Sequence, residues 1–240
     1  MTARVAVVTG GLSGIGRACA DALEQAGHQV AIGSRRGGEG ALPLDVSDAS
    51  SVAAFCDAVN ARFGAPQILV NAAGISVPAE LRDPDPDPWH SQIATNLTGP
   101  YLMIQALMPG MIASGWGRIV NIASTAAHVG AEAYGGYCAS KAGLVALSRV
   151  AALEGAPHGV SCISVSPTWV ETPMLEASAA REAAAEGTSA QSVKDAIAAQ
   201  NPQNRLVQPQ EVAAVVMLGC SEAAPALTNT DISVNAGAQW

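Results

Sequence analysis

Ser124, Tyr137 and Lys141 have the side-chain types and the spacing that proton transfer requires. If residues 137–141 are helical, Tyr137 and Lys141 share one face, because side chains four positions apart are neighbours on a helix. An ammonium beside a phenol stabilises the phenolate, so the pKa of Tyr137 is expected to fall from about 10 toward neutrality. Tyr137 is therefore a candidate acid and base. A pair with this spacing also occurs by chance, so its meaning depends on a matching site elsewhere in the chain.

The segment Thr-Gly-Gly-Leu-Ser-Gly-Ile-Gly, residues 9–16, is a candidate phosphate-binding turn between an expected strand and an expected helix. Glycine permits a sharp turn and a close approach to the backbone, and a helix start offers free N–H groups to an anion. The order of strand, turn and helix favours a pyrophosphate site over a turn with only a structural role. The residues expected to bind the cofactor here are Gly10, Leu12, Ser13, Gly14, Ile15 and Gly16.

The end of the second expected strand indicates which dinucleotide fits. In folds of this kind an acid at that position contacts the ribose 2′-hydroxyl, whereas basic residues favour a 2′-phosphate. Here Ser34 occupies the acidic position, and Arg35 and Arg36 follow it. The sequence therefore favours NADP(H) over NAD(H), with two solvent-exposed loop arginines as the structural alternative.

Composition narrows the class of protein. The 240 residues are 49% hydrophobic and carry a formal charge of −8. The longest basic run is the pair Arg35-Arg36, which argues against nucleic-acid binding. The sequence shows neither a membrane span nor a signal peptide, so a cytoplasmic protein is expected. Five scattered cysteines predict buried thiols rather than disulfides or zinc ligands, and the four histidines have no metal-binding spacing.

Short runs rich in valine and isoleucine alternate with segments at helical spacing, a pattern typical of a parallel sheet covered on both faces. The expected strands are Val5 to Thr9, Gln29 to Ser34, Ala41 to Asp45, Ile68 to Ala72, Arg118 to Ala123, Val160 to Ser166 and Asp231 to Asn235. The expected helices are Gly14 to Ala26, Ala49 to Phe63, Trp89 to Ala113, Tyr134 to Ala156 and Pro209 to Cys220.

Three segments interrupt this alternation. Arg35 to Gly40 is too short for a crossover helix and is expected to be a glycine-rich loop. Asp83 to Pro88 is expected to be an extended surface link, because each proline biases the residue before it away from helix. Residues 171–205 are expected to form a helical insertion that covers the substrate, within one domain that spans residues 1–240.

Taken together, these motifs resemble the short-chain dehydrogenase/reductase family, and the match extends from Val5 to the carboxyl end. The glycine turn is similar to the family's cofactor turn. The other matching motifs are Asn71-Ala-Ala-Gly74, with Ala72 in place of the second asparagine, Asn96 in Ala-Thr-Asn-Leu, Ser124 in Asn-Ile-Ala-Ser, and the pair Tyr137 and Lys141. Several independent motifs in the family's order make chance a remote explanation.

The resemblance implies a single α/β Rossmann domain, with a doubly wound seven-stranded parallel sheet in the order 3-2-1-4-5-6-7. It places Asp45 and Val46 beside the adenine and Asn71, Ala72 and Gly74 along the cofactor cleft. The further cofactor-binding residues that it implies are Tyr137, Lys141, Pro167, Val170 and Thr172. Thr168 replaces the glycine usual in that last segment, which leaves the conformation of the loop open.

For the reaction, the resemblance implies reversible hydride transfer between a nicotinamide and a carbonyl compound or secondary alcohol, with no metal. Ser124 would hydrogen-bond the carbonyl oxygen and Tyr137 would deliver the proton. Lys141 would bind the nicotinamide ribose, and Asn96 would hold a water of a proton relay. Each of the four also has a structural interpretation, such as a strand-end hydroxyl or a core aromatic residue.

The substrate is less well indicated. The candidate pocket residues are His128, Trp169, Met174 and Leu175. Several segments are similar to bacterial 3-ketoacyl-thioester and polyketide ketoreductases, which favours a 3-oxoacyl thioester or a comparable ketone. The chain is acidic and poor in lysine, so a free ketone or a coenzyme A thioester is at least as well supported as a carrier-bound substrate.

Two alternatives stay open. One is a dehydrogenase of a cyclic alcohol, steroid or sugar, and the other is a regulator that senses NADP(H) without turnover. The complete catalytic set argues against the regulator, because a sensor needs no acid and base. The family usually forms tetramers or dimers through the helices Trp89 to Ala113 and Tyr134 to Ala156, so a homo-oligomer is expected.

Overall fold

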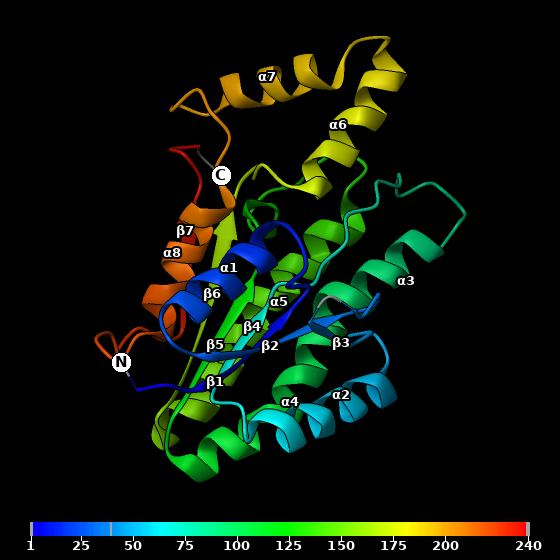
Figure 1. The fold of residues 1–240 in the computed structure, drawn as a ribbon. Helices are drawn as coiled ribbons and strands as arrows, with labels where there is room; N and C mark the ends of the chain where they lie inside the picture. Colours follow the sequence, from blue (N-terminus) through cyan, green and yellow to red (C-terminus); the bar gives the residue numbers. More distant parts are fainter. Residues whose placement is uncertain (1, 39, 239–240) are drawn as a thin grey trace.

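The computed structural model describes residues 2–38 and 40–238, in which seven strands form one parallel sheet. The strand order is β3-β2-β1-β4-β5-β6-β7, as the sequence predicts. Figure 1 shows the sheet crossing the centre of the molecule. The strands are β1 Val5–Thr9, β2 Gln29–Ser34, β3 Ala41–Pro43, β4 Ile68–Asn71, β5 Gly117–Ile122, β6 Val160–Pro167 and β7 Thr230–Val234.

Helices cover both faces of the sheet, as Figure 1 shows. Apolar residues of α1 and α8 pack on one face, and those of α2, α4 and α5 pack on the other. Successive strand residues point to opposite faces of the sheet: Ala6 and Val8 belong to the core beneath α1 and α8, and Val7 belongs to the core beneath α2, α4 and α5. The helices are α1 Gly14–Gln25, α2 Ala49–Phe63, α3 Asp87–Ile93, α4 Gly99–Ser114, α5 Gly135–Gly155, α6 Pro173–Glu186, α7 Ala190–Gln200 and α8 Pro209–Cys220, with short 3₁₀ turns η2 Thr125–Ala127 and η3 Ala156–His158.

The predicted helix Trp89 to Ala113 is not one α-helix. It consists of α3 and α4, joined by a π-helical turn, η1 Ala94–Thr98. Residue 100 is proline, so the carbonyl of Asn96 lacks the N–H donor that an α-helix would supply four residues later. The wider turn is located at Asn96, and π turns of this kind are frequent at functional sites.

Smaller differences concern element ends. The third strand ends at Pro43 rather than Asp45, and the link expected over Asp83 to Pro88 ends two residues earlier, because α3 begins at Asp87. The loop between β2 and β3 contains no helix in its described residues, and Glu39 of that loop lies outside them. The five cysteines are free, and all but Cys138 are buried, as predicted.

The insertion after β6 folds as the helix pair α6 and α7, which extends beyond the layers of the sheet in Figure 1. This pair has its own small apolar core, which includes Leu175, Val193 and Ile197. Its two chain ends are joined by a bridge between Val170 and Val207. The helix pair is therefore a small unit held over the carboxyl ends of the strands.

Two surface properties complete the fold. Among the described residues, no helix is both long and apolar enough to cross a lipid bilayer. Tyr101, Val150 and Leu153 are large, exposed apolar side chains on α4 and α5. These are the helices for which the sequence predicts a subunit contact, and that contact stays a prediction.

Candidate active site

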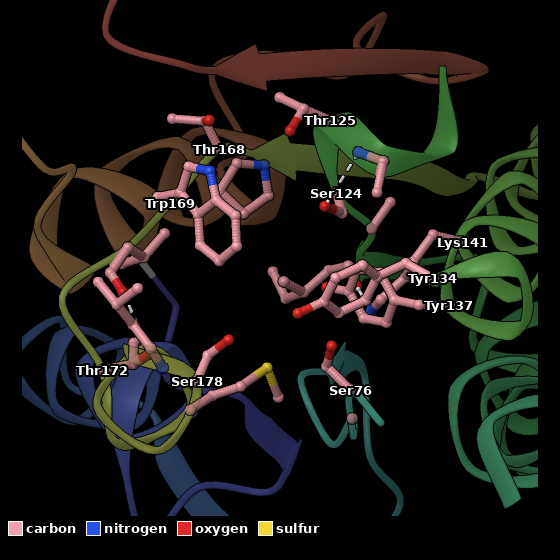
Figure 2. Close-up of a pocket in the computed structure, with 18 of the residues that line it drawn as sticks. Ser76, Ser124, Thr125, Tyr134, Tyr137, Lys141, Thr168, Trp169, Thr172 and Ser178 are labelled. Carbon is pink, nitrogen blue, oxygen red and sulfur yellow. Dashed lines mark hydrogen bonds between the residues drawn. The ribbon is translucent and has the colours of Figure 1, made fainter. Parts of the chain in front are cut away.

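A cavity of about 270 Å³ lies at the carboxyl ends of the strands. Figure 2 shows Ser124, Tyr134 and Tyr137 on one side of it and Trp169, Thr172 and Ser178 on the other. Its walls therefore come from β5, α5, the segment after β6 and α6. The carboxyl edge of an open parallel sheet is where ligands bind in folds of this type.

Ser124 and Tyr137 meet at the cavity wall, as the sequence predicts. Ser124 follows β5 and is the N-cap of η2, where its hydroxyl accepts a hydrogen bond from the Ala126 N–H at 3.1 Å. Ser124 and Tyr137 both line the cavity, and the Ser124 hydroxyl lies near enough to the phenol to lower the pKa of Tyr137. A carbonyl oxygen placed between these two hydroxyls would meet two donors.

Burial raises the pKa of Tyr137, and the nearby Ser124 hydroxyl opposes this only in part. The expectation that Lys141 lowers the pKa of Tyr137 below that of a free phenol is therefore wrong for the protein alone. Lys141 Nζ lies 5.7 Å from the centre of the Tyr137 ring and donates to the Ile122 carbonyl at 2.7 Å. The phenol of Tyr137 is therefore protonated at neutral pH in the protein alone, as a proton donor must be.

Lys141 is buried and has no carboxylate partner among the described residues. Burial lowers its pKa to about 8, because water no longer solvates the ammonium fully. At neutral pH most of the population still carries the proton. The ammonium spends one donor on Ile122 and keeps two for a ligand that enters the cavity.

Asn96 lies behind the cavity and joins several elements. Its amide oxygen accepts from the Ile75 N–H at 2.9 Å, and its amide nitrogen donates to the Ile75 carbonyl at 2.9 Å and to Ser140 Oγ at 3.1 Å. Ser140 in turn donates to the Tyr137 carbonyl at 2.8 Å. The side chain of Asn96 thus holds α5 in place. A relay water would be bound by its main-chain carbonyl, which lacks the α-helical donor at Pro100.

The glycine turn leaves room for a ligand at the start of α1. Gly10 and Gly14 have positive φ angles of 68° and 53°, which glycine adopts without strain. The Gly10 N–H donates to the Gly33 carbonyl at 2.8 Å, and the Ser13 side chain makes no capping bond to the first N–H groups of α1. This combination of small residues and free donors fits a pyrophosphate.

Gly16→Ala tests this turn. A Cβ on Gly16 would lie 2.4 Å from the Gly10 carbonyl oxygen, a backbone atom that cannot move aside. We expect the variant to be destabilised by about 1–3 kcal/mol and to bind NADPH weakly, as measured by denaturant unfolding and fluorescence titration. The control is Gly110→Ala in α4, where no atom lies within 4 Å. It should gain about 0.5–1 kcal/mol. NADPH affinity unchanged by Gly16→Ala would contradict a phosphate site here.

Ser34, Arg35 and Arg36 lie beside the glycine turn, because β2 pairs with β1 and Thr9 faces Gly33. Arg35 and Arg36 are exposed and form no ion pair with any described residue. The carboxylate of Asp45 accepts the N–H and hydroxyl of Ser47, and Val46 is buried next to Gly99. The expected place of Asp45 and Val46 beside the adenine stays a prediction.

Asn71 is buried, and its side chain donates to Asn121 Oδ1 at 2.8 Å. Its expected place along the cofactor cleft stays a prediction. Ala72 and Gly74 do line the cavity. Thr9, which the sequence does not single out, fixes this segment, because its hydroxyl accepts the N–H groups of Ala72 and Ala73 at 3.1 Å.

The end of β6 and the segment after it bring Pro167, Val170 and Thr172 into the cavity wall, where their expected contacts with the nicotinamide stay a prediction. Thr172 caps α6: its hydroxyl accepts from the Leu175 N–H at 3.3 Å and donates to the Val170 carbonyl at 3.1 Å. A Cβ on Gly14 would lie 3.1 Å from Thr172 Cγ2, so this segment contacts the glycine turn. The cavity is thus continuous with the expected cofactor site.

Trp169, Met174 and Leu175 line the cavity, as predicted, although Leu175 is nearly buried in the helix pair. His128 does not line it. Its Nε2 lies 2.8 Å from Asp231 Oδ2, and Asp231 also accepts hydrogen bonds from Ser164 and Ser166. This contact with β7 anchors the loop that follows Ser124 and holds the histidine ring at the sheet.

The structure adds five polar residues to the cavity wall that the sequence did not indicate: Ser76, Thr125, Tyr134, Ser178 and Arg181. Tyr134 lies three positions before Tyr137, and Ser178 and Arg181 continue the spacing of Met174 along α6. That helical spacing is the signal in the sequence by which Tyr134, Ser178 and Arg181 could have been predicted.

Among the described residues, no group of three His, Cys, Asp or Glu side chains is placed to hold a metal ion.

Sequence comparison gives relatives over the whole chain. A family model described as "Enoyl-(Acyl carrier protein) reductase" matches residues 10–239. The D-threitol dehydrogenase of Mycolicibacterium smegmatis is 36% identical over 249 residues, which cover 98% of this chain and 92% of that protein. The acetoacetyl-CoA reductase of Rhizobium meliloti is 36% identical over 245 residues, which cover 98% of both proteins.

Solved structures show the same fold. A variant of actinorhodin polyketide ketoreductase, solved with NADPH, matches with a TM-score of 0.93 and 33% identity, covering 98% of this chain and 97% of that chain. The ligand-free aldohexose dehydrogenase of Thermoplasma acidophilum matches with a TM-score of 0.92 and 29% identity, covering 98% of this chain and 93% of that chain. The relatives therefore act on substrates of several kinds.

Proposed function

This chain belongs to the short-chain dehydrogenase/reductase family, and we propose that it is an NADPH-dependent ketoreductase. The observation that carries the proposal is that Ser124, Tyr137 and Lys141 line one cavity wall. The same cavity is lined by Pro167, Val170 and Thr172, the residues expected to contact the nicotinamide. The two exposed arginines after β2 favour NADP(H) over NAD(H). The reaction would be the reversible interconversion of a ketone and a secondary alcohol.

Bound NADPH would supply the hydride, and the residues of this chain would position the ketone and handle the proton. Ser124 would donate a hydrogen bond to the carbonyl oxygen, where negative charge develops. Tyr137 would give its phenolic proton to the same oxygen. Its phenol is protonated at neutral pH and can therefore act as the donor, since burial raises the pKa of Tyr137 further above that range.

Lys141 would bind the ribose hydroxyls with the donors that Ile122 does not use. Its ammonium can then return a proton toward Tyr137 through those hydroxyls. Asn96 would connect Lys141 to solvent through a water on its main-chain carbonyl, because its side chain is committed to Ile75 and Ser140. In this proposal Asn96, Ser124, Tyr137 and Lys141 each have a different role in the reaction.

The cavity favours a ketone with an apolar body over a sugar. Val129, Trp169 and Met174 contribute large apolar side chains to its wall. A polyol would leave hydroxyl groups against these surfaces without hydrogen-bond partners, which costs binding free energy. A 3-oxoacyl thioester or a comparable ketone fits this wall better, and acetoacetyl-CoA is the substrate in the name of one relative.

The test is NADPH consumption across a panel of aliphatic ketones, keto acids, 3-oxoacyl thioesters, cyclic ketones and sugars, with product chirality recorded. We expect turnover of ketones or thioesters with one predominant product enantiomer. Turnover limited to sugars would contradict the ketoreductase assignment. Binding of NADPH with no turnover of any panel member would favour the regulator.

A further inference from the structure

Arg181 is a cation on the cavity wall that the proposed reaction does not use. It lies on α6 with Met174 and Ser178, which also line the cavity. Their spacing of four and three residues places the three side chains on one face of the helix. Arg181 is seven residues beyond Met174, which corresponds to about 10 Å along the axis. This helix face therefore runs from an apolar end near the capped start of α6 to a basic end.

Among the described residues, the wall has no negative charge to oppose this cation. The chain has 20 acidic and 12 basic residues, yet the described residues that line the cavity include Lys141 and Arg181 and no Asp or Glu. An acidic protein thus presents a positively charged cavity. Lys141 is deep and already donates to a carbonyl. Arg181 is the cation left for a second group of the substrate.

Arg181 has no ion-pair partner among the described residues. Its helix neighbours at three and four residues are Ala177, Ser178, Ala184 and Ala185, so α6 offers it no carboxylate at those positions. Lys194 on α7 differs, since it pairs with Glu171 at 2.6 Å and Glu176 at 3.1 Å. The helix pair therefore neutralises one of its cations and leaves the one on the cavity wall available.

We propose that Arg181 binds an anionic group, a carboxylate or a phosphate, on the part of the substrate remote from the ketone. This inference rests on the proposed function and narrows its substrate class to keto acids and phosphate-bearing thioesters. The planar guanidinium matches both anions with two parallel hydrogen bonds. The Ser178 hydroxyl, one turn away on the same face, is a second donor. The apolar wall between the two ends accommodates the chain that connects them.

The first experiment measures binding without turnover. Octanoate and octanamide are titrated by calorimetry into the wild type, Arg181→Ala and Arg181→Lys, with NADPH present to occupy the cofactor site. We expect the wild type to prefer octanoate by about tenfold or more, Arg181→Ala to lose the preference and Arg181→Lys to retain part of it. The control is Arg62→Ala, an exposed arginine of α2 that does not line the cavity. It should keep the wild-type preference.

A wild type without preference, or a preference that survives Arg181→Ala, would overturn the inference. If NADPH fails to bind, the proposed function fails on its own. The same titrations without NADPH still test Arg181, so the two failures are distinguishable.

The second experiment separates the two anions. Steady-state kcat/KM is measured for levulinate against its methyl ester, and for acetoacetyl-CoA against acetoacetyl-N-acetylcysteamine. In Arg181→Ala we expect a fall of about tenfold to hundredfold for the charged member of one pair and no change for its neutral partner. A fall for levulinate identifies the carboxylate, and a fall for acetoacetyl-CoA identifies the phosphate. An equal fall for charged and neutral members, or no fall at all, contradicts the assignment.

Discussion

Replacing Tyr137 by phenylalanine is expected to lower kcat for ketone reduction by about 10²- to 10⁴-fold while NADPH affinity is unchanged. The variant keeps the ring that lies 5.7 Å from Lys141 Nζ and removes only the hydroxyl. The lost group is the proposed proton donor, and Ser124 remains in the cavity wall. Stopped-flow single turnovers and fluorescence titration measure the two quantities separately.

Tyr134→Phe is the matched comparison, because Tyr134 lines the same cavity one turn earlier. Its effect on kcat should be far smaller. Wild-type turnover in Tyr137→Phe, or a large loss in Tyr134→Phe instead, would remove Tyr137 from the assigned role.

The pH profile follows from the same two groups. Burial raises the pKa of Tyr137 and lowers that of Lys141 to about 8. On the acid side of pH 8 both groups carry their protons, so ketone reduction should be constant there. As the pH rises through about 8, Lys141 loses its charge and reduction should slow. Oxidation of the alcohol needs a proton acceptor and should change in the opposite direction.

A triple variant, Ser34→Asp with Arg35→Ala and Arg36→Ala, is expected to shift the preference from NADPH to NADH by about 10²-fold or more in kcat/KM. Each charge-assisted contact to the 2′-phosphate contributes about 1.5–3 kcal/mol, and two are lost. The new carboxylate repels the phosphate and accepts the 2′-hydroxyl of NADH. Arg62→Ala, which removes an exposed arginine far along the chain from β2, should leave the preference unchanged. A wild type that already prefers NADH would contradict the interpretation of Arg35 and Arg36.

The sequence predicted the strands, the glycine turn and the pair Tyr137 and Lys141 because the evidence for each of them is local. Valine-rich runs between helical segments specify parallel strands, and the glycine turn must follow a strand and open a helix to bind phosphate. Tyr137 and Lys141 are one helical turn apart, so their shared face depends on α5 alone. The family resemblance then supplied the order of strands, which local patterns do not determine.

The features that the sequence did not predict depend on contacts between distant segments. The sequence placed His128 in the pocket because it follows Ser124 closely. In the structure His128 contacts Asp231, which lies 103 residues away and whose proximity the sequence alone does not show. The π turn at Asn96 involves Pro100 within the helix and Ile75 and Ser140 outside it. The pKa of Tyr137 is raised by burial, which is a property of the folded chain.

Arg181 lies in an alanine-rich segment where the spacing shows a helix but not what the helix faces. Only the folded pair α6 and α7 places that residue on the cavity wall. The cover of the site, which is the least regular part of the sequence, therefore contains the residue that we propose binds a second group of the substrate.

The most direct test of the central claim is transfer of deuterium from NADPH that carries the label at C4 of the nicotinamide. Wild-type protein, labelled NADPH and a ketone accepted in the panel are incubated, and the alcohol is analysed by mass spectrometry and NMR. Hydride transfer predicts one deuterium on the carbinol carbon when the label is on the transferred face, and none when it is on the other. An alcohol whose carbinol hydrogen comes from solvent, or no alcohol with any ketone, would contradict the account.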